Sequence, residues 1–488
     1  MAKKVSNANK NLKKTATKPK SKKEAVGVKQ TRQATKSNPP TSINHLQQIH
    51  QLAWTGQHAA AIEAATGELT RLPKSQKFLK IRLDLLDLRS ESYIAIGKLD
   101  LAMKDATEMM KLAKAGGTQP AALKAQALKR LAFVQIPLGK LNDAIKSAHS
   151  ATKLKHNSTQ LLATSLLALS EAQFRAQQSE VAVQSAQKAI ALFQELGDPS
   201  GAGRAHWALA VAYYNLGRAE DARHATQTAL ELCQQAGDGY GIGNALNVMT
   251  FTDADIAEGI QHTHQAIQAF EAAGYAERKG IALMNLALSY ANLGLFAQSQ
   301  RLTSQAIEAL RAMNAKDALA YAVANIIGYE SILGMKASAC QRLRELEALA
   351  ADSGDPFIEI AVPQTKGLLA FAEGDLKTAI RFYKSAVKMN INRSIKSDLT
   401  QLGKAYLAAH EPVAALQATT KAMRLHQAEK FVNIEFPPQD IWWRHTQALL
   451  ANKKPKKPAK LMTAPTTSYS NRSATFAMWV CAATRSTK

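Results

Sequence analysis

The sequence predicts an all-α protein built as a repeat array, and three observations support this fold class. The first is composition, since 46% of the residues are hydrophobic but only 6% are aromatic, and alanine and leucine are frequent. Such a composition favours helix over strand. The second is apolar periodicity with helical spacings of three and four residues. The third is the return of one pattern about every forty residues, which predicts stacked helical units rather than one large core.

The stretch "HWALAVAYYNLGRAEDARHATQTALEL" shows this pattern most clearly. Leu209 and Tyr213 share one face of a first helix, and Gly217 interrupts the periodicity. Ala222 and Ala229 then mark the face of a second helix, so the stretch predicts a helical hairpin. Other stretches carry the same small residues, among them Gly97, Ala102 and Ala106; Gly139, Ala144 and Ala148; Leu169, Ala182 and Ala186; Gly294, Ser299 and Ala306; Gly374, Ala379 and Ala386; Tyr406, Ala415 and Ala422.

These hairpins resemble the tetratricopeptide repeat, in which small residues let two helices approach and glycine permits the tight turn. Their spacing is about forty residues rather than the usual ~34, as in the extended variety found in bacterial signalling and transcription regulators. The resemblance implies a right-handed superhelical solenoid of about ten hairpins with a concave groove. Copies are predicted to begin near Ser42, Leu83, Ala125, Ala163, Gly203, Tyr240, Gly280, Ala320, Ile360, Lys396 and Gln439.

The charge distribution divides the chain into three predicted regions. The net charge is +24, of which residues 1–40 carry +11 and residues 451–488 carry +8, so the remaining body carries only +5. Residues 1–41 contain almost no large apolar residue and are predicted to be a disordered lysine-rich tail. Residues 42–450 are predicted to form the repeat array, and residues 451–488 an irregular basic tail.

The end of the predicted array is irregular. The stretch "PPQDIWWRHTQALLANKKP" predicts a first helix, but no second helix pattern follows it. One hypothesis is a natural disordered tail, and another is a shift of reading frame. From Met462 the shifted frame can encode "DRAYDLLLEQIRNVRDVGLRRN", an amphipathic helix. This text is similar to the end of the tetratricopeptide region in bacterial signalling proteins, where GAF and adenylate or guanylate cyclase domains follow. The resemblance implies the input half of such a protein.

No sequence motif predicts catalysis, a metal site or a cofactor. Three cysteines lie far apart without a CxxC pair, and the histidine pair His262 and His264 is spaced too closely to share a metal on one helical face. The glycine-rich stretch "AGDGYGIGNAL" fails the phosphate-loop pattern, because Asn244 stands where the last glycine belongs. We expect it to be a flexible connection between repeats. No GxSxG motif is present, so the chain is predicted not to be an enzyme.

The function predicted for such an array is binding of a protein or peptide in the concave groove, in a cytoplasmic signalling context. The sequence contains neither a signal peptide nor a transmembrane pattern. Asparagine amides can hold a peptide backbone through paired hydrogen bonds, and several recur near groove positions of the first helices. The predicted groove residues are Asn215, Asn247, Asn285, Asn292 and Asn325.

Two alternatives come from other functional classes. In one, the chain is a nucleic-acid-associated regulator that uses its basic tails, with weak contact through residues 1–40. Those residues lack arginine clusters and aromatic side chains for base stacking. In the other, the chain is the N-terminal half of a cyclase-type signalling enzyme. The identity of the partner and the oligomeric state do not follow from the sequence.

Overall fold

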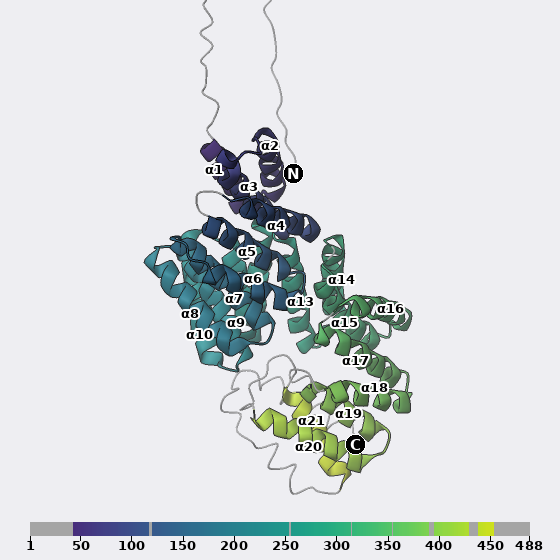
Figure 1. The fold of residues 1–488 in the computed structure, drawn as a ribbon. Helices are drawn as coiled ribbons and strands as arrows, with labels where there is room; N and C mark the ends of the chain where they lie inside the picture. Colours follow the sequence, from purple (N-terminus) through teal and green to yellow (C-terminus); the bar gives the residue numbers. More distant parts are fainter. Residues whose placement is uncertain are drawn as a thin grey trace, which may run out of the picture. The chain divides into compact units, whose positions relative to one another are not determined.

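The predicted all-α class is confirmed in the computed structural model of the chain (Figure 1). The structure describes residues 42–452 apart from 117–119, 253–254, 314, 354, 390–394 and 429–437. Within these ranges it contains 21 α-helices, one short 3-10 helix and no strand. The N-terminal and C-terminal tails predicted from composition, and with them the shifted-frame hypothesis for the last residues, lie outside the described residues.

The helices follow one another with short connections throughout the described ranges. Their bounds are α1 Ser42–Trp54, α2 His58–Arg71, α3 Leu79–Ala95, α4 Leu99–Lys114, α5 Pro120–Gln135, α6 Leu141–Lys153, α7 Thr159–Arg175, α8 Ser179–Glu195, α9 Pro199–Asn215, α10 Ala219–Ala236, α11 Gly239–Thr252, α12 Ile256–Ala272, α13 Ala276–Asn292, α14 Phe296–Ala312, α15 Lys316–Ile332, α16 Lys336–Asp352, α17 Pro356–Ala372, α18 Leu376–Met389, α19 Ile395–Ala408, α20 Pro412–Ala428 and α21 Pro438–Ala451. The 3-10 helix η1 spans Gln76–Phe78 and precedes α3.

Consecutive helices pack against each other all along this series, so the helices form an array of tetratricopeptide-like hairpins. We call the odd-numbered helices first helices and the even-numbered ones second helices. Ten hairpins run from α1 and α2 to α19 and α20, and α21 packs on both α19 and α20 as a further first helix. The predicted repeat architecture is therefore confirmed, with the hairpins stacked in sequence order.

Small residues allow the two helices of a hairpin to approach closely, as predicted. Ala102, Ala144 and Ala222 lie near the start of their second helices and are fully buried. Gly203 on α9 faces α10 so closely that a Cβ atom there would lie 2.5 Å from the sulfur of Cys233. Larger side chains at these positions would push the helices apart, because protein interiors are already close-packed.

The turn between the helices of a hairpin requires a left-handed residue. Gly217 adopts this conformation with φ of 72° between α9 and α10. Two hairpins use other residues at the corresponding turn, since Gln177 has φ of 61° after α7 and His410 has φ of 57° after α19. An L-residue is strained in this region, and both turns are closed by backbone hydrogen bonds, from the N–H of Gln178 to the carbonyl of Gln173 at 2.9 Å and from the N–H of Glu411 to the carbonyl of Tyr406 at 2.8 Å.

The glycine-rich stretch of residues 236–246 was predicted to be a flexible connection. That prediction is wrong, because most of the stretch lies within α11. Gly237 ends α10 in the left-handed conformation, with φ of 67°. The following glycines lie inside α11, where a Cβ atom on Gly243 would lie 2.6 Å from the ring of Phe270. A Cβ atom on Gly241 would overlap the sulfur of Cys233. These glycines serve close helix packing instead of flexibility.

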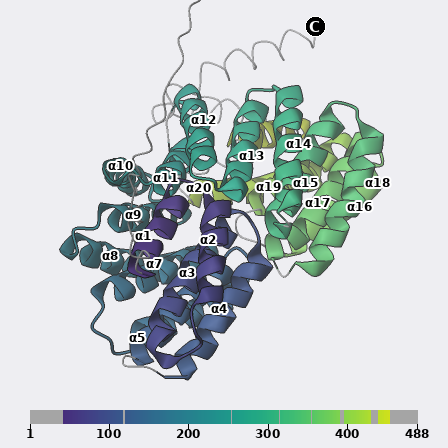
Figure 2. The same ribbon diagram turned by 90° about the horizontal axis from the view of Figure 1, so that it is seen from above.

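The array also contacts itself between distant repeats, along a line that we call the seam. His58, at the start of α2, lies against the connection between α12 and α13, with its Nε2 3.0 Å from the carbonyl oxygen of Ala273. Its ring packs edge-on against Tyr275 at 5.2 Å between centroids. Figure 2 shows α2 beside α13, whose first residue directly follows Tyr275. The seam continues with close approaches of Gly56 to Ala272, of Gly97 to Met313, and of Gly139 to Asp317.

Candidate functional site

The first helices form the inner surface of the array. They contact one another from repeat to repeat, for example α5 with α7, α7 with α9, and α19 with α21. Among the described residues, no two second helices make a comparable contact. In a curved array the more closely spaced row lies on the inside of the curve. We therefore call the surface built by the first helices the inner surface.

Between α3 and α5, the inner surface carries a cluster of buried ion pairs. Asp87 accepts a hydrogen bond from Lys129 Nζ at 2.8 Å and another from Arg130 Nε. Arg130 also donates to Glu91 at 2.9 Å. Burial alone would raise the pKa of Asp87, but the charges of Arg130 and Lys129 outweigh it and hold the pKa far below its usual range. These acids stay ionised because the cations are held beside them.

A second ion pair joins α9 to the start of α11. Arg204 donates to both carboxylate oxygens of Asp238, at 2.5 and 2.9 Å. Asp238 is only 2% exposed and also accepts from Ser200 Oγ and from the backbone N–H of Gly241. Burial would raise the pKa of Asp238, yet the charge and hydrogen bonds of Arg204 lower it below its ordinary value. The bidentate pair also places the Arg204 guanidinium 5.0 Å from the ring centre of Tyr240.

A third group connects α7 with α13 across the inner surface. Arg278 on α13 donates to Glu171 on α7 at 3.2 Å and to the hydroxyl of Tyr240 at 3.1 Å. Its guanidinium lies 5.7 Å from the ring centre of Trp207. Glu171 also accepts from Arg175 at 3.0 Å. Residues far apart in sequence are thereby held together on one polar face, which rigidifies this part of the array.

These three groups are electrostatically linked. Burial would raise the pKa of Glu91, but Arg130 and, with a smaller effect, Arg204 lower it. Side chains from six successive first helices, α3 to α13, thus form one mixed-charge surface. This surface was not predicted from the sequence. The available signal was the pairing of opposite charges about one repeat apart, on successive first helices for Asp87 with Arg130, and on α9 and the connection before α11 for Arg204 with Asp238.

The predicted groove asparagines fall into two groups in the structure. Asn247 on α11 and Asn285 on α13 are half-buried on the inner surface, where Asn285 Nδ2 donates to Asn247 Oδ1 at 2.8 Å. Asn325 is exposed at the corresponding turn of α15, one repeat further on. Asn215 and Asn292 are exposed in the last positions of α9 and α13, and Asn215 Nδ2 donates to the carbonyl of Phe174 at 3.3 Å. Whether any of the five binds a partner stays a prediction.

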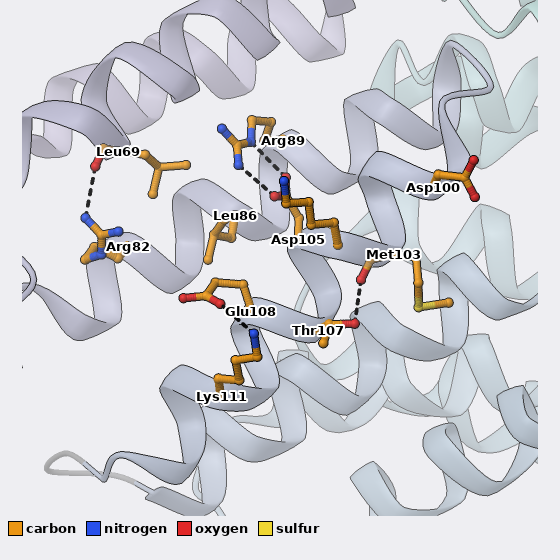
Figure 3. Close-up of a pocket in the computed structure, with 11 residues that line it drawn as sticks. Leu69, Arg82, Leu86, Arg89, Asp100, Met103, Asp105, Thr107, Glu108 and Lys111 are labelled. Atoms are coloured by element: carbon orange, nitrogen blue, oxygen red, sulfur yellow. Dashed lines mark hydrogen bonds and ion pairs between the residues drawn. The ribbon is translucent and has the colours of Figure 1, made fainter.

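A pocket of about 480 Å³ lies between α2, α3 and α4 (Figure 3). Two arginines from α3 line it, and both are engaged. Arg89 donates to the two carboxylate oxygens of Asp105 at 2.8 and 2.6 Å, and Arg82 donates to the carbonyl oxygens of Leu69 and Leu72. Figure 3 shows the side chains of Arg89 and Asp105 pointing toward each other. We therefore interpret Arg82 as a link to the preceding hairpin, and the pair of Arg89 with Asp105 as a link between the two helices of one hairpin.

The described residues contain no group of three or more histidine, cysteine or acidic residues placed to hold a metal ion. None of the described helices combines the length and apolar character needed to cross a membrane. Cys233 is buried and Cys340 is half-buried. Burial, strengthened by the negative charge of Asp238, raises the pKa of the Cys233 thiol to about 12, so the sulfur stays protonated and packs as a small apolar group.

Comparison with known proteins finds solved structures to which the chain is similar at low sequence identity. A Rap protein complexed with competence and sporulation factor is 12% identical, with 80% of this chain and 99% of that chain aligned and a TM-score of 0.49. A signal transduction ATPase with a tetratricopeptide repeat sensor from Pyrococcus horikoshii is 16% identical, with 72% and 52% aligned and a TM-score of 0.45. Aspartyl phosphate phosphatase F from Bacillus subtilis is 13% identical, with 79% and 94% aligned and a TM-score of 0.35.

No protein-family model matches the sequence. No curated protein matches it either.

Proposed function

We propose that the chain is an interaction scaffold that binds a protein or peptide segment on its inner surface, as the sensory or regulatory module of a signalling system. The observation that carries the proposal is the polar inner surface of α3 to α13, where side chains of six first helices meet in one mixed-charge region. Such a surface suits a polar extended segment, because its paired side chains hold charges of both signs in fixed positions along its length.

The regulatory step of the proposed function is differential binding. A partner that prefers one curvature of the array shifts the population toward that curvature. The contact of His58 with Ala273 ties the first hairpin to the connection before α13, so a change in curvature is coupled to this contact. The two alternatives, nucleic-acid contact through residues 1–40 and a cyclase-type enzyme, depend on residues outside the described ranges.

Site-specific photo-cross-linking in the full chain tests the proposed binding. A photoreactive amino acid replaces Asn325, which is exposed on first helix α15, and α15 packs on α13 at the end of the mixed-charge surface. In a matched control it replaces Gln234, which is exposed on second helix α10. At physiological salt, we expect cross-links to a partner from position 325 and none from position 234. Adding Asn285→Ala should reduce the yield, because it removes the amide that organises Asn247.

The proposed function fails if position 234 captures the same partners with the same yield as position 325. It also fails if a folded chain labelled at position 325 captures no protein or peptide. Circular dichroism of both labelled chains establishes that the helical array is intact before cross-linking is compared.

A further inference from the structure

A second pocket, of about 340 Å³, lies at the C-terminal end of the inner surface. It is lined by Phe371 on α17, by Lys404, Leu407 and Ala408 on α19, and by Arg444 and Gln447 on α21. All three helices are first helices. Its volume is at the lower end of the range of small-molecule sites, about 300 to 1,000 Å³. The charges in this pocket differ from those in the rest of the inner surface.

Lys404 is a half-buried cation that packs on an aromatic ring. Its ammonium group lies 4.6 Å from the ring centre of Phe371. Among the described residues, no carboxylate lies within ion-pair distance of it. An ammonium group has three hydrogen-bond donors, and a ring face satisfies none of them fully. Lys404 therefore reaches into the pocket with its donors available.

Arg444 adds a second positive charge to the same pocket. Its Nε is 3.2 Å from Asp440 Oδ1, and its Nη1 donates to Gln447 Oε1 at 2.9 Å. These contacts hold the guanidinium in place and turn the amide oxygen of Gln447 toward it, so the amide N–H₂ of Gln447 remains a donor. Lys404, Arg444 and Asp440 together carry a net charge of about +1, since each group bears one unit of charge at neutral pH.

The two cations act on each other. Burial, and next the positive charge of Arg444, lower the pKa of Lys404, while Asp440 raises it by a smaller amount. Like charges that share a pocket repel, and a bound negative group relieves that repulsion. Phe371, Leu407 and Ala408 supply an apolar wall beside the cations. The pocket thus combines donors and positive charge with an apolar surface.

We propose that this pocket is a binding site for an oxyanion, a phosphoryl or carboxylate group carried on a small apolar body. Lys404 and Gln447 donate hydrogen bonds to the anionic oxygens, Arg444 supplies further positive charge, and the apolar body lies against Phe371 and Leu407. The site does not depend on partner binding by α3 to α13, because different helices and different residues build it.

Titration of the full chain with two small probes tests the site. Phenyl phosphate and benzoate carry the two oxyanions on the same ring, and benzyl alcohol is the uncharged control. We expect at least one oxyanion probe to bind, measured by isothermal titration calorimetry, and benzyl alcohol not to bind. The stronger probe identifies which oxyanion the pocket prefers. Phenyl phosphate should be favoured if the donors of Lys404, Arg444 and Gln447 converge on a tetrahedral group.

Lys404→Met removes the charge and keeps most of the volume of the side chain. We expect it to weaken binding about tenfold or more, which is typical for losing a charge-assisted hydrogen bond. Lys384→Met is the matched control. Lys384 is an exposed lysine on second helix α18 that also lies over an aromatic ring, at 5.6 Å from Tyr406, but it does not line the pocket. Its removal should leave the affinity unchanged.

The proposal is overturned if Lys404→Met binds the probes as tightly as the original chain, or if neither oxyanion binds saturably below about 10 mM. If Lys404→Met does not fold, Gln447→Ala and Lys404→Arg decide the matter. The first should weaken binding and the second should retain much of it. Equal affinity in all variants would also reject the site. Capture of a partner at position 325 tests the proposed function separately.

Discussion

The inner surface differs between α3 to α13 and α17 to α21, although the same hairpin unit builds both. In the first region, cations meet acids one repeat away, as Arg204 meets Asp238. In the second region, Lys404 packs on the ring of Phe371 and forms no ion pair with any of the described residues. The hairpin determines which positions face inward, whereas the local sequence determines whether a charge there is paired. A paired surface is fixed in place, and an unpaired cation is available to a ligand.

The comparison predicts, first, that acids on the two parts of the inner surface contribute unequally to stability. Asp238→Ala leaves the Arg204 guanidinium without its carboxylate and removes a hydrogen-bond acceptor from the N–H of Gly241. We expect the free energy of unfolding to fall by about 3 to 5 kcal/mol, as for other broken buried ion pairs. Urea denaturation monitored by circular dichroism measures this loss.

Asp440→Ala is the control for that experiment in the second region. The side chain of Asp440 is 28% exposed, and its partner Arg444 lies one turn further along the same helix. We therefore expect the free energy of unfolding to fall by only about 0.5 to 1 kcal/mol. The same substitution should strengthen oxyanion binding, because it removes the negative charge beside Arg444. Equal destabilisation by the two substitutions would contradict the difference between the regions.

The second prediction concerns the seam, which joins N-terminal and central repeats among the residues that the structure describes. Gly56 and Gly217 both have positive φ, at 77° and 72°. A Cβ atom on Gly217 meets open space, but one on Gly56 overlaps the carbonyl oxygen of Ala272. Gly217→Ala should cost about 1 to 2 kcal/mol from backbone strain alone. Gly56→Ala should cost about 1 to 3 kcal/mol more because of the steric overlap.

Hydrogen exchange at α12 and α13 distinguishes the two glycine variants. Gly56→Ala should increase exchange there, far from the substitution in sequence, and Gly217→Ala should not. If exchange at α12 and α13 is the same in both variants, the seam does not hold these helices in solution.

The third prediction is a pH dependence of oxyanion binding. Because burial and Arg444 lower the pKa of Lys404, its ammonium loses a proton at a lower pH than an ordinary lysine. Affinity for the bound probe should therefore fall as the pH rises through that pKa, by up to about tenfold. Titration calorimetry at pH 8 and pH 10 measures the change. Lys404→Arg should show little change, since arginine stays charged; the other charged groups at the pocket are Arg444 and Asp440.

The smallest expected effect is a pH dependence of the seam. Burial lowers the pKa of His58 below its ordinary value of 6.5, against the weaker opposing effects of Ala273 and Glu91. Below about pH 6.5 the unfolded chain therefore binds a proton more readily than the folded one, and stability falls as the pH falls. His58→Gln should reduce this slope, measured by thermal unfolding between pH 8 and pH 5. An unchanged slope would exclude His58 as its source.

Much of the fold could be predicted from the sequence, because the hairpin is a local structure. Small residues such as Ala102 and Ala222 and turn glycines such as Gly217 act within one repeat, and their spacing is visible in the chain. The non-glycine turns at Gln177 and His410 were not predictable from composition, since both positions adopt a positive φ that glycine ordinarily marks in a sequence. The same holds for the glycines of α11, which look like a loop unless the position of Phe270 is known.

The inner surface was only partly predictable. Asn247 and Asn285 were identified from their recurrence, and they do form a hydrogen bond between adjacent first helices. The contact of Arg278 with Glu171 joins residues 107 positions apart, and no spacing rule for one repeat reaches that far. Lys404 was missed for another reason. Its distinguishing feature is the lack of an acidic partner, which is a property of the packed structure.

The seam has a mechanical consequence. Parts of the array that are already in contact cannot move closer together, but they can be pulled apart. Because His58 already contacts Ala273, we expect the array to resist compression at once. A pulling force should instead separate the repeats in contact at the seam before any hairpin unfolds. Stretched between two anchors, the array would yield in two stages, first at the seam and then repeat by repeat.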